Sequence, residues 1–335
     1  MTRMTVEKAL DLALRQEMAR DASVLLMGEG VATKRRHLVE AFGRERVRNT
    51  PLAEAIIAGT AAGAAASGLR PVVDLLFAPF LTYSMDALVN SAGKLRYLSG
   101  GQFNFPLVAM TLTGAGWAVG GQHNHNLEAM FVHAPGVKVV MPSTAADFHG
   151  LLRASIRDEN PVLFFTDIGL LYAEGEVPDD PEHIVPLGQA AVRRAGSDVT
   201  LVSYAKTVGV CEQAAEQLAG EGVSAEVIDL RTLKPLDEAA VLRSVRKTGR
   251  LVVVTEASGL CGLAAEIAAV AATKAFDALR APVVRITGPD APAPGSWALE
   301  QAGVPQVEAV VRAALQLARG RAARAEFPEP AVAIA

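Results

Sequence analysis

Short, continuous runs of aliphatic and β-branched residues alternate with helical patterns along almost the whole chain. In the first half the runs are VLLMG (24–28), PVVDLLF (71–77), PLVAMTL (106–112), VKVVMP (137–142) and PVLFF (161–165). Because the runs are apolar throughout instead of alternating with polar residues, they indicate strands buried on both faces. Helical patterns separate them near 54–68, 80–96, 126–134 and 144–157. This order predicts an α/β fold with a parallel sheet wrapped by helices.

The pattern breaks at 173–188, where AEGEVPDDPEHIVPLG is rich in Pro, Gly and acid and carries no period. It then restarts with strands at 198–204, 223–230, 250–257 and 282–288 and helices near 206–220, 237–248, 261–276 and 303–319. Asp237 is expected to cap the second of these helices. A length of 335 residues fits two domains at roughly 150 residues each. The expected organisation is a first domain at 1–175, a linker at 176–188, a second domain at 189–320 and a flexible tail at 321–335.

Composition excludes several classes of function. The net charge of −4 gives no basic surface for nucleic acid. No apolar run reaches the roughly 20 residues that span a bilayer, and the N-terminus has no apolar signal core. Cys211 and Cys261 are too few for a disulfide framework or a zinc cluster, and both are expected to be small buried residues. These features predict a cytoplasmic protein that binds neither nucleic acid nor membrane.

Five longer segments are more specific than this alternation. They are TPLAEAIIAGTAAGAAASGLRPVVD (50–74), DALVNSAGKLRYLSGGQF (86–103), GGQHNHNLEAMFVHAPGVKVVMPST (120–144), VIDLRTLKPLD (227–237) and ITGPDAPAP (286–294). Together they resemble the beta subunits of pyruvate, branched-chain 2-oxo acid and acetoin dehydrogenases. The resemblance implies a pyrimidine-binding thiamine diphosphate fold with a parallel sheet, followed by a transketolase-like C-terminal α/β domain. It also implies a heterotetramer of two alpha and two beta chains, with the cofactor at each alpha–beta interface.

Glu54 matches the glutamate that ends the T-P-x-x-E motif of this family. There the carboxylate shares a proton with a pyrimidine nitrogen and so favours the imino form that activates the cofactor. Without the resemblance, an acid that complements the dipole of a helix N-terminus is the simpler explanation. The resemblance also implies that Phe80 packs on the pyrimidine ring and that Leu52 and Leu76 line the same pocket. Ordinary core packing is the alternative for these three residues.

His123 matches a family histidine that faces the substrate and takes part in proton transfer, a role that suits a side chain titrating near neutral pH. In this chain it lies in Gln122-His123-Asn124-His125. A plain loop histidine is the alternative. A metal held by His123 and His125 would lack a third ligand at a familiar spacing, so no metal site is assigned.

In the enzymes that the chain resembles, a GDG motif supplies ligands to the Mg²⁺ that anchors the cofactor diphosphate. The sequence contains neither a GDG motif nor a Walker-type loop. The resemblance therefore implies an alpha subunit that carries the GDG motif and binds Mg²⁺. Met110, Leu112, Trp117 and His125 depart from the usual family residues. These departures put the substrate and the acyl acceptor in doubt more than they do the thiamine chemistry.

The leading hypothesis is the beta subunit of a 2-oxo acid dehydrogenase that decarboxylates its substrate and passes the acyl group to the lipoyl group of a transacylase. One alternative keeps the cofactor but changes the acceptor, as in a two-component acyloin synthase or a transketolase-like ketol transferase. The other alternative is a scaffold protein without catalysis, which would not need Glu54, Phe80 and His123.

Overall fold

The computed structural model describes residues 1–180 and 182–320, so the predicted tail lies outside the described residues. The chain divides into two compact units. The first comprises residues 1–113 and 122–187, and the second comprises residues 114–121 together with the chain from Gly188 onward. Within the described residues, no helix is long and apolar enough to cross a membrane.

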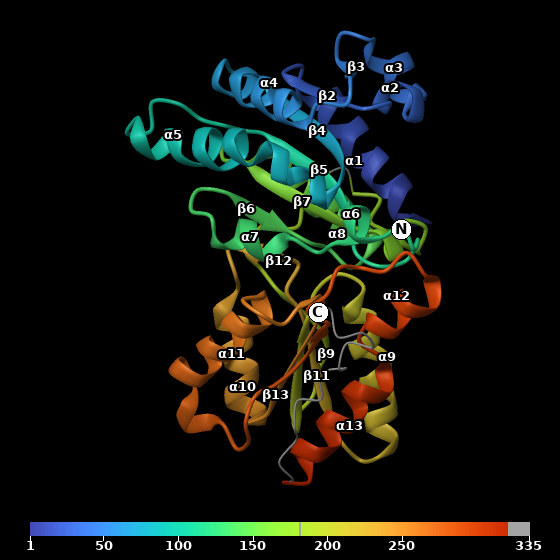
Figure 1. Cartoon of the computed structure of the whole chain (residues 1–335), viewed down its shortest axis with the longest axis vertical. Helices are drawn as coiled ribbons and strands as arrows, with labels where there is room; N and C mark the ends of the chain where they lie inside the picture. The colour runs from blue at the N-terminus through green and yellow to red at the C-terminus, as the bar shows by residue number, and fades with distance from the viewer. Residues whose placement is uncertain (181, 321–335) are drawn as a thin grey trace. The chain divides into compact units, whose positions relative to one another are not determined.

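The first unit is built on parallel strands that lie in the order β6, β7, β5, β4, β2 and β3 (Figure 1). Their bounds are β2 Val24–Gly28, β3 Val47–Asn49, β4 Arg70–Phe77, β5 Val108–Thr113, β6 Lys138–Val140 and β7 Val162–Asp167. The predicted apolar runs form five of these strands, and β7, for example, is buried along its whole length. The parallel sheet predicted for this half is confirmed.

Helices cover this sheet and share an apolar core with it. They are α1 Val6–Arg20, α2 Val31–Lys34, α3 Arg36–Phe42, α4 Glu54–Ala66, α5 Gly93–Leu98, α7 Glu128–His133 and α8 Ala145–Arg157. The helices α1 and α8 pack on each other, and the buried Glu17 carboxylate accepts a 2.8 Å hydrogen bond from Arg153 there. Helical structure is present near 80–96 as expected, but it is divided into three consecutive helices of different type. The chain forms a 3-10 helix η1 (Ala78–Ser84) and a π-helix η2 (Asp86–Ala92) before α5.

A short antiparallel pair was not foreseen. β1 (Thr2–Thr5) pairs with β8 (Glu174–Val177), so the first residues of the chain are joined to the end of the first unit. Both strands are short and largely polar, and their partners lie about 170 residues apart, so neither produces a local pattern.

The second unit has the strand order β14, β13, β10, β11 and β9. These strands are β9 Ala191–Arg194, β10 Val199–Ser203, β11 Ala225–Asp229, β13 Leu251–Ser258 and β14 Val284–Gly288. All pairs are parallel except β9 with β11, which is antiparallel and which the sequence did not predict.

Helices lie on both faces of this second sheet (Figure 1). Two pairs pack together, α9 (Thr207–Gly220) with α13 (Val307–Ala318), and α10 (Glu238–Thr248) with α11 (Leu263–Lys274). Asp237 caps α10 by accepting a 2.9 Å hydrogen bond from the Ala240 amide, as predicted. The short helix α12 (Trp297–Gly303) lies in a region where no element was predicted.

Candidate active site

Glu54 is the first residue of α4 and lies half-buried after the loop that leaves β3. The hydroxyl of Ser84, the last residue of η1, donates a 3.0 Å hydrogen bond to the Glu54 carbonyl. This bond ties η1 to the start of α4. Within the described chain, no hydrogen bond or ion pair engages the Glu54 carboxylate, so it is available to a ligand. The buried Thr50 hydroxyl, four residues earlier, also has no hydrogen-bond partner there.

Leu76 turns the chain at the end of β4. Its φ is +57°, a left-handed conformation that is rare for a residue other than glycine. Two side chains hold this turn. Asp74 Oδ1 accepts from the Leu76 amide at 3.2 Å, and Thr111 Oγ1 donates to the Leu76 carbonyl at 3.3 Å. The turn is therefore fixed from β4 itself and from the neighbouring strand β5.

Three rings form a cluster at the start of η1. The His123 ring contacts the Phe77 ring at 4.8 Å and the Phe80 ring at 5.4 Å between centroids, and each pair is edge-to-face. Phe77 and Phe80 lie 6.2 Å apart, also edge-to-face. Each such contact contributes about 1 kcal/mol beyond the area that it buries. The cluster fixes the imidazole of His123, which belongs to the short helix α6 (Gly121–Asn124).

Three of the predicted site residues are connected in the structure. Phe80 and His123 touch, and Glu54 is linked to the Phe80 segment through Ser84. Leu52 is 67% exposed in this chain, so any pocket that it lines needs a further surface. The sequence interpretation missed Phe77 and Ser84. Phe77 ends an apolar strand and therefore resembles a core residue, although its spacing of three from Phe80 on a helix-like turn was a usable signal.

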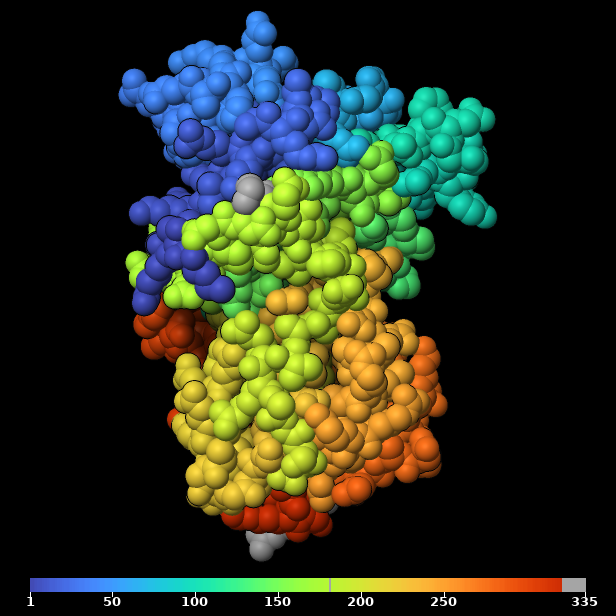
Figure 2. Space-filling model, turned by 180° about the vertical axis from the view of Figure 1, so that it is seen from behind, coloured from blue at the N-terminus to red at the C-terminus, as the bar shows by residue number. Residues whose placement is uncertain are grey.

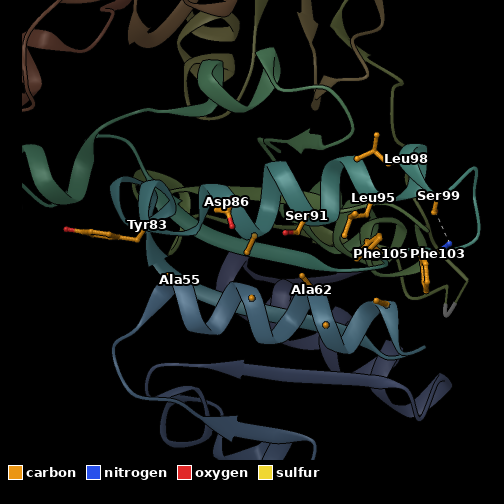
Figure 3. Close-up of a pocket in the computed structure, with 14 residues that line it drawn as sticks. Ala55, Ala62, Tyr83, Asp86, Ser91, Leu95, Leu98, Ser99, Phe103 and Phe105 are labelled. Atoms are coloured by element: carbon orange, nitrogen blue, oxygen red, sulfur yellow. Dashed lines mark hydrogen bonds between the residues drawn. The ribbon is translucent and has the colours of Figure 1, made fainter.

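An apolar pocket of about 640 Å³ adjoins this region. One wall is the small-residue face of α4, and the other is formed by η2, α5 and the segment after α5 (Figure 3). Its lining residues include Ala55, Gly59, Gly63, Leu98 and Phe103. The part of the chain around α5 projects from the first unit in the space-filling view (Figure 2). The pocket does not include the predicted cofactor residues.

The other histidines and the two cysteines differ in how deeply they are buried. His149 is buried on α8, whereas His133 and His125 are exposed. Cys211 is buried as expected, but Cys261 is exposed, so the expectation of a second buried thiol is wrong. Among the described residues, no group of three or more His, Cys, Asp or Glu side chains gathers as a metal site.

Comparison with protein families assigns both halves of the chain. The pyrimidine-binding domain of transketolase matches residues 2–172, and the C-terminal domain of transketolase matches residues 188–310. The fold agrees with a solved structure described as a split gene transketolase, inactive beta4 tetramer. That structure has a TM-score of 0.77 and 25% sequence identity, and the match covers 95% of this chain and 99% of that one.

Curated relatives resemble the chain over nearly its full length. Pyruvate dehydrogenase E1 component subunit beta-2, mitochondrial, of Oryza sativa subsp. japonica is 45% identical over 93% of this chain and 85% of the relative. The acetoin:2,6-dichlorophenolindophenol oxidoreductase subunit beta of Bacillus subtilis (strain 168) is 40% identical over 94% and 97%. The 2-oxoisovalerate dehydrogenase subunit beta of the same organism is 41% identical over 88% and 91%. The chain therefore belongs to the family of beta subunits of the heteromeric, thiamine-diphosphate-dependent 2-oxo acid dehydrogenases.

Proposed function

We propose that this chain provides the pyrimidine half of a thiamine diphosphate site and works with an alpha subunit as a 2-oxo acid dehydrogenase. The observation that carries the proposal is the available Glu54 carboxylate at the start of α4, joined through Ser84 to the segment that bears Phe80. The buried Thr50 hydroxyl, which has no hydrogen-bond partner within the described chain, is a second polar group in the same loop. A carboxylate, a hydroxyl and an aromatic ring suit an aminopyrimidine, so the residues present fit this half of the cofactor.

Each residue then has a defined task. Glu54 would hold the aminopyrimidine through a proton-sharing hydrogen bond, and Phe80 would hold it by ring packing. The chemistry that thiamine diphosphate supplies when bound is a carbon nucleophile and an electron sink for the loss of carbon dioxide. His123 orients the 2-oxo acid and moves a proton at its ring nitrogen, in the position fixed by Phe77 and Phe80.

An alpha subunit completes the enzyme in this proposal. It would carry the GDG motif and hold Mg²⁺ and the diphosphate, for which this chain has no motif. The apolar pocket beside α4 supports such a partner, because apolar surfaces rimmed by polar residues mark interaction sites. We further propose an assembly of two alpha and two beta chains, with a lipoyl transacylase as the acceptor of the acyl group.

Turnover of a panel of 2-oxo acids with an artificial electron acceptor tests this function. The chain is assayed alone, with a GDG-containing alpha chain from the same genome, and with thiamine diphosphate and Mg²⁺. We expect turnover only in the mixture and a loss on the order of 100-fold or more in Glu54→Gln. Glu40→Gln, an exposed acid of α3, is the matched control and should keep full activity. Full turnover in Glu54→Gln would remove the proposed mechanism.

Addition of a lipoyl domain separates the possible acceptors. Acylation of the lipoyl group identifies the dehydrogenase, whereas condensation with an added aldehyde identifies an acyloin synthase or ketol transferase. If the mixture shows neither turnover nor cofactor binding, only the scaffold hypothesis remains.

A further inference from the structure

Residues 114–121 connect β5 to the helix that carries His123, and they are grouped with the second unit instead of the first. The segment has an unusual backbone, because Ala118 is left-handed at φ +51° and Gly114 and Gly120 also have positive φ. Few side chains in it can pack, since it reads GAGWAVGG. Hydrogen bonds of its backbone are therefore important for holding its conformation.

Two carboxylates of the second unit accept hydrogen bonds from the backbone of this segment. Glu300 of α12 is only 3% exposed, and its two oxygens accept from the Gly116 and Ala118 amides at 3.0 Å each. Glu256 of β13 accepts from the Ala115 amide. Hydrogen bonds that involve a charged partner are about twice as strong as neutral ones. A buried carboxylate is costly unless it is paired in this way, so removing Glu300 frees the centre of the segment.

Further contacts hold both ends of the segment. Lys206 forms a 2.6 Å ion pair with Glu256 and donates a 2.5 Å hydrogen bond to the Ala115 carbonyl. At the other end, a Cβ added at Gly121 would lie 3.1 Å from the Pro292 Cβ, so the second unit closely contacts that glycine. The segment is thus fixed at its start, its centre and its end. His123 follows two residues after Gly121 along the chain.

We propose that Glu300, supported by the Lys206–Glu256 pair, is a positioning residue that fixes the backbone leading to His123. The proposal rests on the function proposed above for His123. In this arrangement the contacts of Glu300 and of the Lys206–Glu256 pair set the backbone conformation of residues 115–118, from which the chain continues into the helix that carries His123. Catalytic geometry is sensitive to such changes, since a displacement of about 1 Å can cost about 100-fold in rate.

Trp117 provides a direct reporter of the segment. The chain has two tryptophans, so Trp297→Phe leaves Trp117 as the single emitter. Trp297 is 58% exposed, and this background is expected to fold normally. In it, Glu300→Gln should raise the quenching of Trp117 by acrylamide, while Glu308→Gln, an exposed acid on α13, should leave quenching unchanged. Unchanged quenching in Glu300→Gln overturns the anchoring, whether or not the enzyme turns over any 2-oxo acid.

Kinetics of the alpha–beta mixture test the positioning itself. Glu300→Gln should lower kcat per folded enzyme by about tenfold or more, with KM for the 2-oxo acid and the Kd of thiamine diphosphate little changed. A lower melting temperature with unchanged kcat would show that Glu300 is merely structural and would overturn the proposal. If Glu300→Gln does not fold, Glu256→Gln, which weakens the Lys206 pair at the start of the segment, is put through the same two measurements. Absence of turnover by the wild-type mixture would instead count against the proposed function.

Discussion

His149 is fully buried on α8, with its Nε2 atom 2.7 Å from Gln16 and its ring stacked on His183 at 5.8 Å. Burial, and to a smaller extent the neighbouring charges of Arg153 and His183, lower the pKa of His149 to about 4, while Glu17 opposes this shift. The unfolded chain binds a proton to this histidine below its ordinary pKa of about 6.5, whereas the folded chain does not until about 4. The neutral, buried ring therefore stabilises the fold above pH 6.5, and this contribution is lost as the pH falls from 6.5 to 4.

Replacing His149 should make the free energy of unfolding depend less strongly on pH. The lowered pKa corresponds to roughly 3 kcal/mol of unfolding free energy across the window. His149→Gln is expected to be less stable than the wild type at pH 7 but to lose less on acidification, as measured by urea unfolding between pH 7 and pH 4.5. His133→Gln, at an exposed position of α7, is the control and should keep the wild-type slope. An equal slope in His149→Gln would show that another group governs acid stability.

The two cysteines should differ sharply in reactivity. Burial raises the pKa of Cys211 to about 12, so almost no thiolate forms there near neutral pH. Cys261 is exposed. Titration with a thiol-specific chromogenic reagent should therefore modify one thiol in the native protein and two after denaturation. Loss of the native reaction in Cys261→Ser, but not in Cys211→Ala, would identify Cys261 as the reactive thiol. Rapid modification of both thiols in the native protein would contradict the burial of Cys211.

At the scale of elements, the turn before β6 depends on a glycine. Gly136 has φ +88°, and a Cβ there would lie 1.7 Å from the carbonyl oxygen of Gly93, in the first residue of α5. Gly136→Ala must therefore separate α5 from this turn, and we expect it to destabilise the protein by about 3 kcal/mol. Gly209→Ala in α9 is the matched control, because nothing lies within 4 Å of its added Cβ. Thermal unfolding checks both, and similar melting temperatures for the two variants would be inconsistent with this packing.

The elements also show what local patterns can and cannot predict. Strands such as β2 and β7 were predictable because burial on both faces leaves a continuous apolar run. The β1–β8 pair and the antiparallel strand β9 were not, because their pairing depends on residues far away in the chain. For the site, Glu54 and His123 could be chosen only through the family resemblance. The contacts of Glu300 with residues 116–118 have no local signature at all.

At the scale of the whole molecule, α4 presents an exposed face that a partner can cover. Gly59 and Gly63 are exposed on this helix, and a Cβ at either would meet nothing within 4 Å in this chain. Glycine inside a helix costs about 1 kcal/mol relative to alanine, so the isolated chain gains nothing from these two residues. Close approach of another surface would account for these two glycines. Ile56, which is 70% exposed on the same helix, is a further apolar side chain that such a surface could cover.

A larger side chain at Gly63 should consequently weaken assembly with the partner without impairing the folding of the isolated chain. Gly63→Leu is expected to leave the melting temperature of the isolated chain unchanged or slightly higher, because an added Cβ meets nothing within 4 Å and Gly63 borders the apolar pocket. The same variant should weaken association with the alpha subunit by at least about tenfold, since a leucine on a closely packed face forces the two surfaces apart. Analytical ultracentrifugation of the mixture measures this effect. Ala219→Leu, which adds the same apolar side chain to an exposed position of α9, is the control and should assemble normally. Normal assembly of Gly63→Leu would mean that the alpha subunit binds elsewhere, and the small residues of α4 would then need another explanation.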